Sequence, residues 1–242
     1  MRSARLMLDP PAPGAWNMAV DEVLLDSAAT AGIATLRFYQ WSEPTLSLGY
    51  FQAAAGREQH PASRACPLVR RASGGGAIVH HRELTYSIAL PLRDSRSQAA
   101  TDLYNACHES LVAALAELGV TAEMYQPAES CAVSAESHAN RPFLCFERRA
   151  CGDIVCGTSK IVGSAQRRRR GAVLQHGSIL LGRSACAPEL PGIEQFTRQS
   201  ITAGQIIHDW PNRLAARLQL AIAPARLTSD EHQNAATIAD SR

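Results

Sequence analysis

Apolar positions that recur every three to four residues mark three helical stretches along the chain. The first covers residues 16–29, with Asn17 as a candidate N-cap. The second covers residues 98–118 and ends before a glycine, a common helix stop. The third covers residues 203–220 and contains Pro211, where we expect the helix to break or restart because proline lacks a backbone donor.

Shorter apolar runs bounded by turn-forming residues predict strands. They cover residues 34–41, 45–51, 67–73, 77–90 and 120–126, and a further series fills 143–181 with turns at 157–159 and 167–171. A polar loop is predicted at 127–141. Because the strands come in clusters and do not alternate with helices, we expect an α+β fold with a mixed or antiparallel central sheet flanked by helices.

The length of 242 residues predicts one domain with a substantial core. We place that domain at 1–228 and interpret 229–242 as a polar, flexible tail. Hydrophobic residues make up 46% of the chain and charged residues 19%, as is usual for a globular protein. No apolar run reaches the roughly 18–20 residues that span a bilayer, and the N-terminus lacks the apolar stretch of a secretory signal. These features predict a cytoplasmic protein with no membrane association.

The formal net charge of +2 is too small to indicate nucleic-acid binding. The seven cysteines are odd in number and irregularly spaced, which does not fit the disulfide framework of a secreted protein. Cys145, Cys151 and Cys156 lie close together, but there is no CxxC pair, so we predict no metal site. Four adjacent arginines at 167–170 fit either a solvated turn or a docking site for an acidic partner.

The use of lysine is unusual. The chain has 24 lysine and arginine residues, and Lys160 is its only lysine. At most surface positions either residue serves as a charge on a long stem, but only an amine can readily change its protonation state or act as a compact cation. A chance outcome of genome composition would also leave a single lysine, so its position in the chain must decide its meaning.

Two further segments have the composition of a binding site. Residues 70–77 place three glycines after two arginines and a serine, and such a backbone can approach a ligand closely. It is neither a Walker loop nor a GxGxxG motif, and the spacing alone also fits a hairpin turn. Residues 175–178 place His176 at the edge of an apolar run, which fits either a catalytic histidine or a buried, hydrogen-bonded one.

Seven short segments that lie one after another along most of the chain carry a resemblance to a known family. They are NMAVDE at 17–22, LRFY at 36–39, PTLSLGY at 44–50, RRASGGG at 70–76, ELTYS at 83–87, KIVGSAQ at 160–166 and QHGSIL at 175–180. Together they resemble the lipoate–protein ligase and octanoyltransferase family, which is related in fold to biotin–protein ligase. The resemblance covers roughly residues 15–185, and it implies the catalytic fold of that family.

The resemblance assigns roles by position. The lysine of the family's Lys-x-x-Gly-Ser motif falls on Lys160, so the family motif and the lysine count agree on one residue. The residues that it implies for substrate binding are Arg71, Ser73, Gly74, Gly75, Gly76, His81, Gly163, Ser164, His176 and Gly177.

A cysteine distinguishes the branches of the family. In transferases typical of Gram-positive bacteria the nucleophile lies in a Cys-Phe segment fifteen residues before the lysine, and Cys145-Phe146 stands at that spacing from Lys160. The resemblance therefore implies transfer of an octanoyl or lipoyl group from acyl carrier protein, through a thioester on Cys145, to a lysine of a lipoyl domain or glycine cleavage H protein. No cofactor is expected for this reaction.

Two alternatives stay open. The triple glycine is more typical of ligases, so the chain fits an ATP-dependent lipoate–protein ligase that lacks the accessory C-terminal domain. ATP and magnesium would then be required, and Cys145 would be incidental. A non-catalytic binding module of the same fold is the third interpretation; an intact Lys160 and glycine segment argue against it.

Overall fold

A computed structural model describes residues 1–92, 97–127 and 142–242. Its centre is an eight-stranded mixed sheet with the strand order β11-β1-β2-β6-β10-β9-β8-β7. The strands are β1 (Arg2–Leu8), β2 (Ala34–Tyr39), β6 (Glu83–Pro91), β7 (Glu123–Met124), β8 (Ile154–Cys156), β9 (Ser159–Arg169), β10 (Ala172–Leu180) and β11 (Leu220–Pro224). β1 pairs in parallel with β2 and β11, and the other neighbours are antiparallel. The α+β class with a mixed sheet is confirmed.

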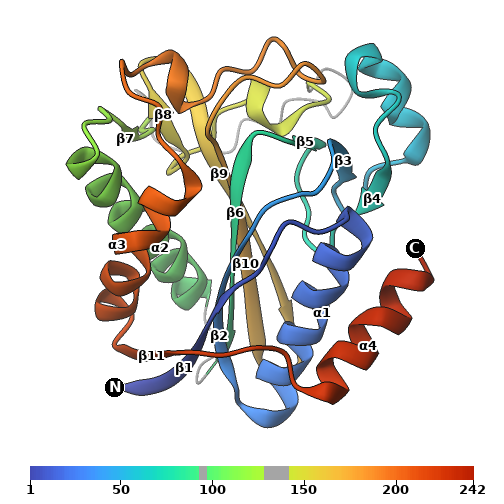
Figure 1. Ribbon diagram of the computed structural model, residues 1–242, viewed down its shortest axis with the longest axis vertical. Coiled ribbons are helices and arrows are strands. Elements are labelled where there is room, and N and C mark those ends of the chain that lie inside the picture. Colours follow the sequence, from blue (N-terminus) through green and yellow to red (C-terminus); the bar gives the residue numbers. More distant parts are fainter. Residues whose placement is uncertain (93–96, 128–141) are drawn as a thin grey trace.

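Helices cover both faces of this sheet (Figure 1). On one face lie α1 (Gly14–Ala31) and α4 (Ser229–Asp240), and on the other lie α2 (Ser97–Glu117) and α3 (Ala203–Arg217). Because both faces are covered, all nine positions of β10 are buried. Within the described residues no helix combines the length and the apolar character that crossing a membrane requires.

A second, three-stranded sheet carries the glycine segment. It has the order β4-β3-β5 and consists of β3 (Thr45–Leu48), β4 (Leu68–Arg70) and β5 (Ile78–His80). Residues 71–77 connect β4 to β5, so the glycines lie in a loop between two strands that both pair with β3. The single strand expected at 77–90 is in fact two strands, β5 and β6, that belong to different sheets.

Two helix predictions were wrong in detail. α1 begins at Gly14 after Pro13, and Asn17 lies buried inside it, where its amide donates to the carbonyls of Ala12 and Gln40 instead of capping the helix. α3 runs through Pro211 without a break. Proline costs that helix a hydrogen bond, but Trp210 and Pro211 are buried against the core, and this packing outweighs the local cost.

The expected flexible tail is also different in the structure. Residues 229–240 form α4, which packs against α1, and Ala235 is fully buried. Thr228 caps the helix by accepting from the Glu231 N–H. The Glu231 carboxylate accepts two hydrogen bonds from Arg5 at 2.7 and 2.8 Å. Polar composition suggested a tail because these long-range partners are invisible in the local sequence. The predicted polar loop at 127–141 lies almost wholly outside the described residues.

Candidate active site

Cys145 opens a short 3-10 turn, η4 (Cys145–Glu147), that lies against the glycine loop. Its backbone N–H donates to the carbonyl of Ala77 at 2.7 Å, and the Ala77 N–H donates to the carbonyl of Phe143 at 3.0 Å. The approach is close, because a β-carbon built on Gly76 would lie 3.1 Å from the Cys145 nitrogen. Glycine at this position therefore lets the segment that carries the thiol pack directly on the loop.

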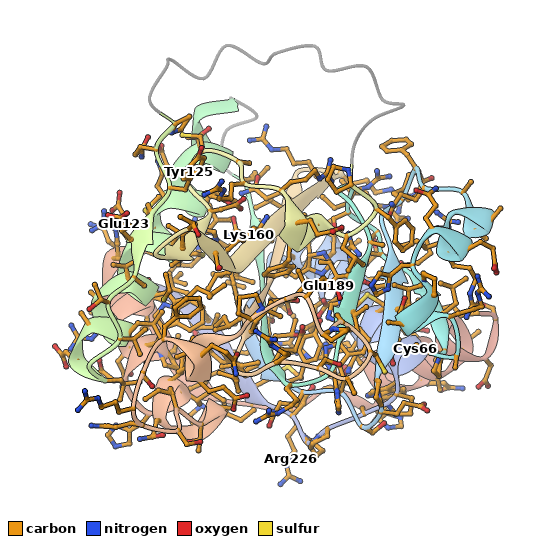
Figure 2. All side chains as sticks on the ribbon, turned by 90° about the horizontal axis from the view of Figure 1, so that it is seen from above. Cys66, Glu123, Tyr125, Lys160, Glu189 and Arg226 are labelled. Atoms are coloured by element: carbon orange, nitrogen blue, oxygen red, sulfur yellow. The ribbon has the colours of Figure 1, made fainter. Side chains whose placement is uncertain are left out.

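The single lysine lies beside this thiol. The Lys160 Nζ is 3.8 Å from the Cys145 Sγ and 2.8 Å from the Asp153 Oδ2. The side chains of Lys160 and Asp153 are only 5% and 3% exposed, so solvent screens their ion pair little. A carboxylate stabilises an ammonium, and an ammonium stabilises a thiolate. The three groups thus form a row in which the lysine can stabilise negative charge at the sulfur. Figure 2 shows Lys160 within the body of the molecule.

Asp153 is itself held from two sides. Its Oδ2 accepts from the backbone N–H of Ala150 at 2.7 Å, and its Oδ1 accepts from the Tyr104 hydroxyl at 3.1 Å. Burial raises the pKa of Tyr104, with the neighbouring Asp153 charge adding to the effect, so this hydroxyl stays a donor. Gly163 provides the space for the lysine, because a β-carbon there would lie 2.5 Å from the Lys160 Cε.

A directed chain of hydrogen bonds runs next to the ion pair. His108 on α2 bonds through Nδ1 to the Gly152 carbonyl at 2.6 Å and through Nε2 to the Ser164 hydroxyl at 2.7 Å. Since a carbonyl only accepts, Nδ1 is the donor and Nε2 accepts from Ser164. The Ser164 oxygen lies 2.8 Å from the hydroxyl of Tyr86, which accepts from the Gln175 amide at 2.7 Å. Burial lowers the pKa of His108 to about 4, so the imidazole is neutral near pH 7.

A pocket opens beside Cys145, with about 480 Å³ of empty space when its solvent-open mouth is included. Most of the surface that its lining presents is apolar. The lining residues are Met18, Tyr39, Arg71, Gly74, Gly75, Ile78, His80, Thr85, Cys145, Phe146, Gly163, Ser164, Ala165, His176, Gly177 and Ser178. An acyl chain attached to the Cys145 sulfur could extend into this pocket.

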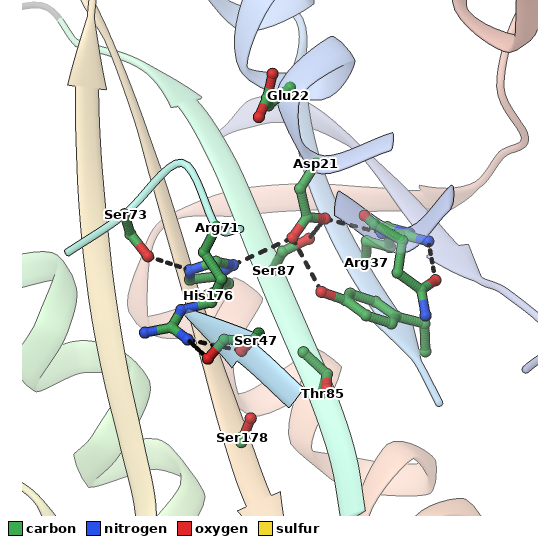
Figure 3. A network of polar contacts seen from close by, with 12 residues as sticks. Asp21, Glu22, Arg37, Ser47, Arg71, Ser73, Thr85, Ser87, His176 and Ser178 are labelled. Carbon is green, nitrogen blue, oxygen red and sulfur yellow. Dashed lines mark hydrogen bonds and ion pairs between the residues drawn. The ribbon is translucent and has the colours of Figure 1, made fainter. Parts of the chain in front are cut away.

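The base of the pocket rests on a buried network around Asp21 (Figure 3). The Asp21 carboxylate accepts from Arg37 at 2.8 Å, Tyr39 at 3.0 Å and Ser87 at 2.8 Å, and it lies 3.3 Å from the His176 Nδ1. Burial alone would raise the pKa of Asp21, but the hydrogen bond with His176 and the charge of Arg37 lower it below its ordinary value. Asp21 is therefore an anion that fixes the orientation of His176.

The same network holds the glycine loop. His176 Nε2 is 2.5 Å from the hydroxyl of Ser73, the residue before the three glycines. Arg71 donates to the Gly76 carbonyl at 2.8 Å and the Ser47 hydroxyl at 2.6 Å. Burial lowers the pKa of Arg71 to about 10, although the charge of Cys145 acts to raise it. Most polar atoms of these side chains are engaged in this way, although the Arg71 Nε is buried without a hydrogen-bond partner, and the surface left for a ligand is mainly apolar.

Ser47 links Arg71 to a second histidine. The His80 Nε2 is 2.6 Å from the Ser47 hydroxyl, and its Nδ1 is 2.8 Å from the Glu83 Oε1. The His80 ring also stacks on Trp41 with their centroids 3.8 Å apart. Burial lowers the pKa of His80, with the Glu83 charge opposing the shift. Each histidine beneath the pocket thus joins a serine hydroxyl to a buried carboxylate.

The structure brings together most of the residues expected from the sequence. Seven of the expected binding residues line the pocket: Arg71, Gly74, Gly75, Gly163, Ser164, His176 and Gly177. Ser73 lies behind His176, and Gly76 faces a neighbouring groove. His81 does not line the pocket, because it follows β5 and turns to the Ser184 hydroxyl at 3.0 Å. His80 lines it instead.

Sequence reasoning missed the residues that support the reacting groups. Asp153, Tyr104 and His108 belong to none of the recognised segments, and no spacing along the chain relates them to Lys160. Asp21 and Tyr39 do fall in such segments, which was the only available signal for them. Among the described residues no group of three or more His, Cys, Asp or Glu side chains is arranged to hold a metal ion.

The chain is similar to known proteins over most of its length. A family description, the lipoyl protein ligase A/B catalytic domain, matches residues 13–190. An octanoyltransferase LipM of Kyrpidia tusciae is 38% identical over an alignment of 187 positions, which covers 75% of this chain and 67% of that protein. An octanoyltransferase LipM of Symbiobacterium thermophilum is 32% identical over an alignment of 258 positions, gaps included, which covers 95% of this chain and 92% of that protein.

The fold has a solved counterpart. A putative lipoate protein ligase from T. acidophilum, with bound lipoic acid, superimposes with a TM-score of 0.77 at 22% sequence identity. The alignment covers 99% of this chain and 95% of that chain. At this identity the likeness concerns the fold, and it extends to the C-terminal elements beyond residue 190 that the family match leaves out.

Proposed function

The chain belongs to the lipoyl protein ligase A/B catalytic domain family, and on that premise we propose that it moves an octanoyl group from acyl carrier protein, through a thioester on Cys145, to a lysine of a lipoyl domain or glycine cleavage H protein. It is an acyltransferase of protein lipoylation, of the octanoyltransferase type. The donor protein, the thioester and the acceptor are the proposed parts. A cytoplasmic location stays a prediction.

One observation carries the thioester mechanism: the Lys160 Nζ lies 3.8 Å from the Cys145 Sγ. In the first step the Cys145 thiolate attacks the carbonyl of the donor thioester, and a new C–S bond forms. The tetrahedral intermediate then collapses, the original C–S bond breaks, and the carrier thiolate leaves and takes a proton from solvent. The nearby ammonium stabilises the thiolate before attack and the oxyanion during it.

In the second step the uncharged amine of the acceptor lysine attacks the acyl-enzyme. A C–N bond forms, the bond to Cys145 breaks, and the sulfur leaves as a thiolate beside Lys160. The nitrogen loses one proton, which passes to the departing sulfur or to water. The ion pair with Asp153 keeps the Lys160 side chain beside the sulfur throughout this step.

The pocket supports the choice of an acyl substrate. An octanoyl chain needs an apolar cavity that begins at the sulfur, and the pocket beside Cys145 presents mainly apolar surface. Phe146 and Ile78 contribute side chains to it, and Gly74 and Gly75 bring the backbone of the loop to its wall. We propose that amides of this loop bind the carbonyl oxygen of the substrate.

The ATP-dependent ligase is the alternative, favoured by the fold shared with a putative lipoate protein ligase. We propose that no nucleotide is needed, because a thioester donor is already activated. Octanoyl carrier protein without ATP is offered to one sample, and free lipoate with ATP and magnesium to another; the acceptor is followed by intact mass. Modification in the first sample alone supports the transferase. Lipoate-dependent pyrophosphate release, with full activity of Cys145→Ala, would establish the ligase.

A further inference from the structure

Two grooves flank the glycine loop on the outside of the molecule. The first, which we call the apolar groove, has Phe51, Phe143, Gly75, Gly76 and Arg148 in its lining. The second, the arginine groove, has Arg70, Arg71, Arg167, Arg169 and Arg242 in its lining. The acyl pocket shares Gly75 with the apolar groove and Arg71 with the arginine groove, and its other lining residues belong to neither groove.

Two adjacent aromatic residues separate these grooves. Tyr50 lines the arginine groove and is 46% exposed, and Phe51 lines the apolar groove and is 86% exposed. Their rings meet edge to face with centroids 5.0 Å apart. The Tyr50 N–H donates to the Ser73 carbonyl at 2.9 Å, which ties this aromatic ridge to the loop. The Arg167 guanidinium lies 4.9 Å from the centre of the Tyr50 ring. Exposed aromatic and arginine side chains in one place are typical of binding hot spots.

Charge is concentrated at the same place. The chain as a whole has 24 lysine and arginine residues against 22 acidic ones. The two grooves together have six arginines and one acidic residue, Glu22, in their linings. Glu22 is paired with Arg242, Arg169 is paired with Asp26 and Arg71 is buried, so the accessible excess of positive charge comes from Arg70, Arg148 and Arg167. The entrance therefore has a positive field that the overall composition does not suggest, and a field of this kind steers an acidic partner.

The apolar groove adjoins the segment that carries the nucleophile, because Gly76 in its lining packs on the Cys145 backbone. Arg148 lies three residues after Cys145, and its backbone N–H donates to the Cys145 carbonyl at 3.2 Å. Its guanidinium covers Gly76, since a β-carbon built there would lie 2.6 Å from the Arg148 Nη2. A thin flexible chain laid in this groove could bring its end to the sulfur from the solvent side, with a cation beside it.

We propose that the aromatic ridge and its two grooves dock the acyl donor: an acidic protein that presents its acyl thioester on a long, neutral arm with an anionic base. This inference rests on the proposed function. The acceptor fits the surface less well, because it must bring a lysine side chain, itself a cation, into an entrance lined by arginines. The donor arm is neutral where it meets Phe51 and Phe143, and its anionic base and acidic carrier complement the arginines.

The test separates docking from chemistry by using two donors with the full-length enzyme. Acylation of Cys145 is timed by intact mass with octanoyl carrier protein and with octanoyl-N-acetylcysteamine, a small neutral thioester. The variants are Phe51→Ala and Arg148→Gln. The controls are Phe196→Ala, an exposed aromatic outside both grooves, and Arg149→Gln, whose guanidinium lies 5.2 Å from the Tyr125 ring centre, away from the apolar groove.

We expect each test variant to acylate at least about tenfold more slowly with the carrier protein at limiting concentration, and within about twofold of wild type with the small thioester. Each control should match wild type with both donors, although Arg149→Gln removes the same charge as Arg148→Gln. The loss for Arg148→Gln should shrink at high salt. Transfer from pre-acylated enzyme to the acceptor should be unchanged.

Other outcomes overturn the proposal in recognisable ways. Equal losses with both donors would mean that the substitutions damage the acyl site. A loss confined to the transfer from pre-acylated enzyme would assign the ridge to the acceptor. Unchanged acylation by the carrier protein would leave the ridge without this role. If wild-type enzyme is acylated by neither thioester, the proposed function itself fails, and that result does not depend on the variants.

Discussion

The two ends of the acyl pocket are built differently. At the base, both oxygens of Asp21 are hydrogen-bonded, and His176 and Arg37 are buried with partners on the remaining sides. At the reacting end, Cys145 is half-buried, and its thiol has Lys160 at 3.8 Å, longer than an optimal hydrogen bond. A fully bonded network has one favourable arrangement, so the base fixes the shape of the loop. The thiol keeps free bonding capacity, which the proposed attack on a thioester needs.

The largest effect on the rate of acyl transfer is expected from a change at the Cys145 sulfur. Replacing Cys145 by serine or alanine should lower transfer by about three orders of magnitude or more, because no acyl-enzyme can form at a useful rate. Folding should be unaffected, since the thiol contributes little to the core. Wild-type enzyme with octanoyl carrier protein should gain one hydroxylamine-labile octanoyl group, mapped to Cys145 by peptide mass. Normal transfer by Cys145→Ser would show that the Cys145 end of the pocket is no more reactive than its base.

The next effect is expected at Lys160. Lys160→Arg keeps a positive charge, but the planar guanidinium cannot occupy the compact place of the ammonium between Asp153 and Cys145. Loss of one well-placed donor at a developing oxyanion costs about 100- to 1,000-fold in rate, and we expect a loss of that size. The melting temperature is measured alongside to show that the variant is folded. Near-normal rates would make the single lysine a coincidence of composition.

Asp153 should matter less than the groups that it positions. Asp153→Asn leaves the buried Lys160 without its anionic partner, and burial disfavours an uncompensated charge. We expect transfer to fall about 10- to 100-fold, as misplacement by about 1 Å can do, and iodoacetamide to alkylate Cys145 more slowly at neutral pH. Tyr104→Phe, which removes only one hydrogen bond to the carboxylate, serves as the matched control and should cost a few-fold. Unchanged alkylation would limit Asp153 to a structural role.

A substitution at the base of the pocket should lower the free energy of unfolding more than it lowers the turnover rate. Asp21→Asn removes the anion that Arg37 and His176 share, and breaking a buried pair costs about 3–5 kcal/mol. Urea unfolding should show a loss of that order, while the turnover of the molecules that remain folded falls by less than in Asp153→Asn. If Asp21→Asn keeps full stability but loses activity, the base takes part in the chemistry and the contrast between the two ends is wrong.

A carboxylate outside both regions gives the smallest effect. The pKa of Glu231 on α4 is lowered from 4.5 to about 2, because hydrogen bonds from Arg5 and Ser27 outweigh the cost of burial. A lowered pKa in the folded state means that the group stabilises the fold above pH 4.5 and loses this contribution as the pH falls toward 2. The stability advantage of wild type over Glu231→Gln should therefore fade over that range, with activity at neutral pH unchanged. An advantage that persists below pH 2 would contradict it.

The sequence determined the family and the fold class, and it is the source of the prediction that Cys145 and Lys160 are the reacting residues. The fold class followed from clustered strands, and the confirmed octanoyltransferase assignment followed from segments in a fixed order. Lys160 was recognisable because one lysine among 24 basic residues is an unusual composition, and a lysine amine has chemistry that an arginine lacks. Cys145 was recognisable because its distance from Lys160 along the chain is characteristic of a family branch. Such signals are local, or they concern residue type, and a single sequence preserves both.

Only the tertiary structure decided which groups lie around Cys145 and Lys160. Asp153 reaches Lys160 because η4, β8 and β9 fold together, and His108 reaches Ser164 from a helix on the far side of the sheet. β5 and β6 belong to different sheets, so His80 and not His81 faces the pocket. The polar C-terminal residues form a packed helix because Arg5 at the other end of the chain binds Glu231. The contacts of His108 with Ser164 and of Arg5 with Glu231 join residues distant in sequence. The free energy of all these contacts depends on burial and partner geometry, which exist only once the chain has folded.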